Sequence, residues 1–202
     1  MLSRFRFFTC ATFVALAVCS SRPASAANFN VNPTQIFLSS KTTSAMVTVR
    51  NDSDGALRFQ LTVSAWEQSP AGELVLTPTD DIVFFPALLT LGPKEERRVR
   101  VGRVTAPTDK EKTYRIFIEE MPPVDAVSTA GAAVQVLTKM GIPIFVRPAK
   151  ETATAAVTNL EQHDGALHFS LSNSGSVHYV PQQVMVRGLA GGESVFEQKL
   201  DA

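Results

Sequence analysis

The fold is decided by residues 45–67, which read AMVTVRNDSDGALRFQLTVSAWE. On either side of the polar cluster Asn51–Gly55, apolar residues alternate with polar ones, as they do along strands that bury one face. The cluster itself consists of turn-forming residues. We therefore expect a hairpin that joins a strand at Ala45–Asn51 to a strand at Leu57–Glu67.

Runs of the same kind recur along the chain. Short segments rich in Val, Ile, Phe and Thr are separated by Asp, Asn, Gly, Ser and Pro, and no window predicts an amphipathic helix. About seven strands in about 100 residues are typical of an immunoglobulin-like β-sandwich, in which Trp66 is expected to be buried. The other predicted strands are Phe29–Leu38, Leu74–Thr77, Ile82–Leu91, Arg97–Val104, Thr113–Met121 and Ala133–Val146, the longest.

A second β segment follows the first sandwich. Its predicted strands are Leu167–Leu171, Val177–Val180 and Gln183–Arg187. Only 54 residues follow Pro148, whereas a sandwich of this type takes about 100. The predicted fold is thus all-β, with an immunoglobulin-like domain at residues 27–148 and an incomplete β domain at residues 149–202.

The first 26 residues have the pattern of a secretory signal peptide. Arg4 and Arg6 supply the positive region, Phe7–Ser20 is the apolar run, and Ala24–Ala26 is a small-x-small cleavage site. We expect the mature chain to begin near Ala27.

Two other interpretations of this segment fit less well. A membrane anchor needs about 20 apolar residues, and this run is shorter. Lipidation at Cys19 is disfavoured because Val18 is a poor residue at the preceding position. Since Cys10 and Cys19 are the two cysteines of the chain, a mature protein without the leader has no disulfide, thiolate metal site or cysteine nucleophile.

The composition and the polar residues do not point to an enzyme. Without the leader the chain has 16 basic and 19 acidic residues, unlike a nucleic-acid-binding protein. His163, His168 and His178 lack the spacing of metal ligands and are expected at the surface. The adjacent pairs Asp80-Asp81 and Glu119-Glu120 point to opposite faces of a strand. We find no nucleophile motif and predict no catalytic residue, metal or cofactor.

Four segments, in order, resemble the periplasmic chaperones of chaperone–usher pilus systems. They are Val31–Leu38, Val47–Asn51, Tyr114–Pro123 and Ile142–Pro148. The Gly-Ile-Pro-Ile-Phe sequence is similar to the branch that builds archaic fimbriae. The resemblance covers residues 29–148 well and Leu167–Arg187 loosely. It implies a periplasmic chaperone that binds pilin or fimbrial subunits and delivers them to an outer-membrane usher.

The resemblance also implies which residues bind the subunit. A pilin lacks its own last strand, and the chaperone adds an edge strand to the open groove. Val134, Val136 and Thr138 lie on one face of the last predicted strand and are the expected donated side chains. The alternative is that they are ordinary core residues of a sandwich. In that case the protein is an immunoglobulin-like adhesion or structural domain of the cell surface, with a covered last strand.

A pair of basic residues between the domains anchors the subunit's C-terminal carboxylate in chaperones of this kind. On the first strand the corresponding residue is Gln35, which donates hydrogen bonds without a charge. On the last strand the better-known chaperones use the position of Pro143, and the archaic pattern uses Lys139. Since Lys139 is out of phase with Val134, we expect a bulge near Gly141. The alternative is that Lys139 is a solvated surface lysine.

Overall fold

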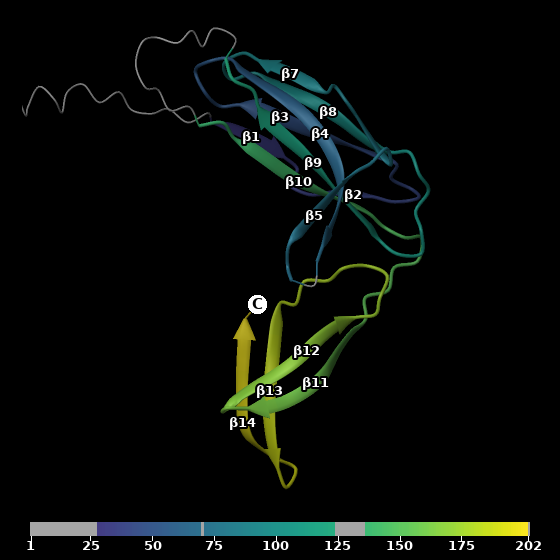
Figure 1. Cartoon of the computed structure of the whole chain (residues 1–202), viewed down its shortest axis with the longest axis vertical. Coiled ribbons are helices and arrows are strands. Elements are labelled where there is room, and N and C mark those ends of the chain that lie inside the picture. Colours follow the sequence, from purple (N-terminus) through teal and green to yellow (C-terminus); the bar gives the residue numbers. More distant parts are fainter. Residues whose placement is uncertain (1–27, 70, 124–135, 202) are drawn as a thin grey trace, which may run out of the picture.

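The computed structural model describes residues 28–69, 71–123 and 136–201 (Figure 1). The expected leader and Val134 lie outside these ranges. Every regular element within them is a strand, so the all-β prediction is confirmed, and none of these residues forms a helix that could cross a membrane. The strands are β1 (Phe29–Asn32), β2 (Ile36–Leu38), β3 (Ser44–Asn51), β4 (Leu57–Gln68), β5 (Leu74–Pro78), β6 (Ile82–Phe85), β7 (Leu88–Leu91), β8 (Glu96–Arg103), β9 (Lys112–Glu120), β10 (Lys139–Val146), β11 (Ala155–His163), β12 (Ala166–Asn173), β13 (Gln183–Ala190) and β14 (Glu193–Asp201).

The first ten strands form a sandwich of two sheets. The first sheet has the order β1-β3-β8-β6, and the second has the order β2-β10-β9-β4-β5 with β7 paired to β4. Alternate residues of both sheets point inward, which is how half-buried strands build a common core. The largest fully buried side chains are Tyr114, Phe59, Ile36, Leu38, Leu91, Ile116, Ile118, Ile142, Ile144, Val47, Val49 and Val99.

The hairpin predicted around Asn51–Gly55 is wrong. β3 belongs to the first sheet and β4 to the second, so the turn crosses from one layer to the other. The buried side chain of Asn51 holds this crossing: its amide donates to the carbonyls of Gly55 (2.7 Å) and Gly92 (2.9 Å). Gly92 lies in the turn from β7 to β8, which crosses back. Alternation identifies half-buried strands, but consecutive strands are neighbours only about two-thirds of the time.

Two long predicted strands are each divided in two. Phe29–Leu38 contains β1 and β2, and Ile82–Leu91 contains β6 and β7; in both cases the halves belong to opposite sheets. Pro33 and Pro86 lie at the breaks. Because proline cannot donate a ladder hydrogen bond, a strand that contains one ends or moves to an edge there.

The C-terminal part consists of two separate hairpins, β11–β12 and β13–β14 (Figure 1). The strand expected at Val177–Val180 is not formed, and this stretch is irregular. It follows a turn at Ser176, whose N–H donates to the carbonyl of the distant Thr152 (2.7 Å). β11 was not predicted, because a register shift between Thr158 and Glu161 interrupts its alternation. β14 was not predicted either, because charged residues break its apolar pattern. The boundary proposed at residue 148 stays a prediction.

A partly exposed polar cluster joins the start of β6 in the first sheet to β9 in the second. The Tyr114 hydroxyl donates to Asp81 Oδ2 at 2.6 Å, and Lys112 Nζ lies 3.2 Å from the same oxygen. The hydrogen bond from Tyr114 lowers the pKa of the Asp81 carboxyl, burial partly opposes this, and Lys112 adds to the lowering. Burial and the Asp81 carboxylate raise the pKa of Tyr114, which therefore stays a protonated donor.

The Asp81 cluster predicts an acid-sensitive contribution to stability. Because the folded-state pKa of Asp81 lies below its ordinary 3.8, the contribution is present above that value and is lost as the pH falls through the folded-state pKa. Asp81→Asn should therefore flatten the fall in the free energy of unfolding between about pH 5 and pH 2, measured by urea denaturation. Asp80→Asn, at the exposed neighbour, is the control and should behave like the wild type. Equal acid sensitivity of Asp81→Asn and the wild type would contradict this account.

Candidate functional site

One strand of the second sheet has a neighbour on one side only along most of its length. β10 pairs with β9 over its whole length, from Lys139 opposite Glu119 onward. On its other side β2 covers only Ile144–Val146. Among the described residues, Lys139–Pro143 therefore forms an open edge of the sandwich.

The main-chain groups of this edge alternate between β9 and the open side. Glu120 N donates to Thr138 O at 2.9 Å, and at the other end Arg147 N donates to Leu38 O on β2 at 2.8 Å. Bonded pairs alternate along an antiparallel ladder, so the even-numbered residues of β10 bond to β9 and the odd-numbered ones point away. Lys139 and Gly141 thus direct both N–H and C=O toward the open side. A further strand can pair with these groups.

The side chains of β10 that face inward share the even positions. Ile142 is buried in the core, and Met140 packs against it partly exposed. Thr138, two residues earlier, is half-buried, and its N–H donates to Glu120 Oε2 at 3.2 Å. Val136 is 64% exposed. The strand predicted from Ala133 begins at Lys139 within the described part of the chain.

Lys139 lies on the opposite, outer face of the same strand. Its ammonium is 2.8 Å from Glu119 Oε2, with both side chains half-exposed, and 5.0 Å from the centre of the Phe117 ring. The register with β9 is continuous from Lys139 to Val146, so the expected bulge near Gly141 is not formed. The Lys139 side chain therefore lies on the outer face, as the two-residue alternation of the strand predicts.

Gln35 does not lie beside Lys139. It is exposed and directly precedes β2, in which Ile36 is opposite Ile144. Extending that register places Gln35 at the level of Pro143. Four strand residues separate this level from Lys139, which is roughly 13 Å along the strand.

Trp66 is not a core residue, contrary to the prediction. It is half-buried, at an even position of β4, whereas the buried Phe59 and Leu61 occupy odd positions. Its ring lies on the outer face of the second sheet, and its Nε1 donates to the carbonyl of Tyr114 on β9 at 3.1 Å. This position makes Trp66 part of the surface beside β10.

Arg115 is a site residue that sequence reasoning missed. It is directly opposite Pro143 on β10, and its guanidinium carbon is 4.9 Å from the centre of the Trp66 ring. Its Nε is buried without a hydrogen-bond partner, and among the described residues no carboxylate forms an ion pair with it. The signal in the sequence is an arginine between the core residues Tyr114 and Ile116. Only the strand pairing shows that it adjoins the open edge.

Gly141 makes room for the Arg115 side chain. A Cβ at Gly141 would lie 2.8 Å from Arg115 Cδ and 3.1 Å from Phe117 Cε1. The aliphatic part of Arg115 therefore crosses the space that a side chain would occupy. Together with the Trp66 ring, this close approach holds the guanidinium in one place on the outer face.

The C-terminal part contacts the sandwich at the end of β10. Glu111 N donates to Ser176 O at 2.8 Å, and the Glu111 carboxylate binds His178 Nδ1. The His178 ring stacks on Phe145 with ring centres 4.2 Å apart. His163, His168 and His178 are all exposed, so their expected surface position is confirmed, and His178 also contacts a carboxylate that is 5% exposed.

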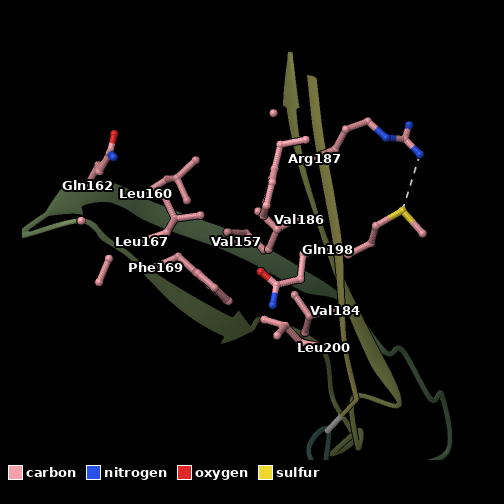
Figure 2. Close-up of a pocket in the computed structure, with 15 residues that line it drawn as sticks. Val157, Leu160, Gln162, Leu167, Phe169, Val184, Val186, Arg187, Gln198 and Leu200 are labelled. Atoms are coloured by element: carbon pink, nitrogen blue, oxygen red, sulfur yellow. Dashed lines mark hydrogen bonds between the residues drawn. The ribbon is translucent and has the colours of Figure 1, made fainter. Parts of the chain in front are cut away.

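An apolar hollow of about 800 Å³ lies between the two C-terminal hairpins (Figure 2). Side chains such as Leu160, Leu167 and Val186 line it, and Arg187 is paired with Glu197 at 3.0 Å. Within the described ranges no group of three His, Cys, Asp or Glu side chains is arranged to hold a metal ion. The hollow therefore offers apolar contact without converging ionisable groups.

The comparison with known proteins gives a family match over most of the chain. Residues 28–152 match the family described as pili and flagellar-assembly chaperone, PapD N-terminal domain. No curated protein sequence matches the chain.

Solved structures of fimbrial chaperones have the same fold. The class 5 fimbriae chaperone CfaA is 16% identical, with a TM-score of 0.66 over 87% of this chain and 80% of its own. The chaperone SafB–pilin SafA complex of Salmonella enterica contains a chain that is 15% identical, with a TM-score of 0.57 over 88% of this chain and 85% of its own. The CsuC–CsuE chaperone–tip adhesion subunit complex of archaic Csu pili of Acinetobacter baumannii contains one that is 18% identical, with a TM-score of 0.54 over 87% and 88%.

The close approach at Gly141 predicts a spectroscopic effect. Gly141→Ala should displace Arg115 from Trp66 and cost about 1–3 kcal/mol in the free energy of unfolding, the range for overpacking. Since Trp66 is the one tryptophan of the chain, its fluorescence should change in the same direction as in Arg115→Ala. Gly55→Ala is the control, because a Cβ there meets nothing within 4 Å. Unchanged fluorescence in Gly141→Ala, with Arg115→Ala shifted, would show that Gly141 does not position the arginine.

Proposed function

The chain belongs to the pili and flagellar-assembly chaperones that carry the PapD N-terminal domain, and we propose that it binds pilin or fimbrial subunits by lending them the open edge of β10. The observation that carries this proposal is the edge itself: Lys139 and Gly141 have main-chain groups that point away from β9, beside the apolar core. Strand addition uses such groups for affinity and alternate side chains for specificity. A covered last strand, as in a purely structural immunoglobulin-like domain, would lack them.

The donated side chains are those in phase with Met140 and Ile142. We propose Val134, Val136 and Thr138 for this role, since a two-residue period places them on the same face. The exposure of Val136 supports the assignment, because a donated side chain is free for a partner before the complex forms. In the complex these side chains fill the groove that the subunit's missing strand leaves open.

The carboxylate at the subunit's C-terminus requires a cation near the edge. Lys139 and Gln35 remain the residues expected from the family resemblance, and we add Arg115 to them. No described carboxylate forms an ion pair with the Arg115 guanidinium, whereas Lys139 is paired with Glu119. Arg115 and Gln35 flank the level of Pro143 from its two sides. A guanidinium presents two parallel donors that match a carboxylate.

The rest of the proposed function follows from the family. The protein acts in the periplasm after removal of the leader at residues 1–26, and delivers its subunit to an outer-membrane usher. The family is a class of chaperones rather than enzymes, and the proposed mechanism uses no cofactor. The structures of chaperones in complex with a pilin or a tip adhesion subunit support a pilus subunit as the partner.

The edge assignment is tested by a double variant. Val134→Asp with Val136→Asp should abolish capture of a pilus subunit, since burying an unpaired charge in the groove costs several kcal/mol. The free chaperone should stay folded, with an unchanged melting temperature. The control is Val104→Asp, at an exposed valine away from β10. A double variant that unfolds on its own, or a control that loses capture equally, would contradict the edge assignment.

The anchor assignment is tested against two forms of the subunit. Arg115→Ala should weaken capture by about 1.5–3 kcal/mol, the range for hydrogen bonds to charged groups. Lys139→Ala and Gln35→Ala are measured beside it. The loss should disappear when the subunit's C-terminus is amidated, because the carboxylate is then absent. If Arg115→Ala weakens both forms of the subunit equally, Arg115 supports the sheet rather than the carboxylate.

A further inference from the structure

The first sheet has an open edge of its own at β6. Within residues 28–69, 71–123 and 136–201, β6 pairs only with β8, and Val104 N donates to Asp81 O at 2.8 Å just beyond the pairing of Ile82 with Arg103. The alternation of an antiparallel ladder then directs odd-numbered residues of β6 toward β8. Ile82 and Phe84 therefore turn their N–H and C=O groups away from the sheet.

Apolar side chains project beside this edge. Phe85 is 77% exposed and Val83 is 55% exposed, both on the face opposite the buried Ile82. With Phe84, Arg100 and Gly102 they line a shallow hollow of about 160 Å³. This volume is comparable to the roughly 150 Å³ cavity that holds a benzene molecule, so it has room for one apolar side chain.

Cations without acidic partners lie on the same face. Phe85 is opposite Arg100 on β8, and Arg98 follows at the next position on that face. Arg100 donates to the Ser44 hydroxyl at 3.2 Å, and among the described residues neither arginine has an ion-pair partner. Asp80, the exposed carboxylate closest to β6 in the sequence, precedes the strand at its other end, and the exposed Glu96 lies two residues before Arg98 on β8.

We propose that the β6 edge binds an extended segment of a partner polypeptide that alternates apolar and acidic residues. The unpaired N–H and C=O groups select a peptide backbone, the hollow accepts an apolar side chain, and Arg98 and Arg100 attract carboxylates. A second copy paired through its own β6 would bring the same arginines together, and like charges repel. This surface belongs to the first sheet, so it is separate from subunit capture through β10 in the second sheet.

The test uses a fluorescent peptide of about eight residues with blocked ends, alternating valine and glutamate, and the full chain. It should bind by fluorescence anisotropy, and a valine–lysine peptide should bind at least about tenfold more weakly, since each hydrogen bond to a charged group is worth about that factor. Phe85→Ser and Arg100→Ala should each weaken binding of the acidic peptide by about tenfold. Leu88→Ser, at an exposed leucine of β7, and Val136→Asp, at the other edge, are the controls and should bind like the wild type.

Four results would overturn the proposal. They are equal binding of both peptides, loss of binding in Val136→Asp with retention in Phe85→Ser, a wild-type dimer in sedimentation that Phe85→Ser dissociates, and binding of phosphatidylglycerol vesicles without binding of the acidic peptide. Phe85→Ser should still capture a pilus subunit. The test of the β6 proposal is therefore independent of the test of subunit capture through β10.

Discussion

A strand with one neighbour leaves half of its peptide groups without a partner, and the candidate site depends on this property of Lys139–Pro143. The two-residue period of a strand then divides the other roles among the residues of β10. Odd residues supply main-chain groups to the open side and carry side chains on the outer face. Even residues, such as Ile142, point toward the core. The alternation along β10 thus gives backbone pairing and charge to the odd residues and apolar contact to the even residues.

The outer face supplies the charge through a small set of mutually dependent contacts. Gly141 leaves the space that the Arg115 stem occupies, and Trp66 lies over the β9 backbone with its ring close to the guanidinium. Lys139 is held by Glu119 instead. A preorganised cation loses less conformational freedom on binding than a mobile one, so it contributes more to affinity.

The sequence predicted where the strands of the sandwich lie better than it predicted which strands pair with one another. Alternation around Asn51 identified β3 and β4 correctly, but the same pattern fits a hairpin or a crossing between sheets. Pro33 and Pro86 were visible signals for the two divided strands. Trp66 and Arg115 could not be assigned to the outer surface near the edge, because this requires knowing that β9 lies between β4 and β10. The family resemblance gave Gln35 and Lys139 as expected anchor positions, but it did not give the distance between them along the sheet.

Amide hydrogen exchange of β10 tests the central claim most directly. In the free chain, the amides of Lys139 and Gly141 should exchange quickly, whereas those of Met140 and Ile142, which bond to β9, should be protected. Addition of a pilus subunit should protect Lys139 and Gly141 and leave the other two nearly unchanged. If Lys139 and Gly141 are as protected as their neighbours in the free chain, or if the subunit does not change their exchange, β10 is not the edge that this chaperone lends.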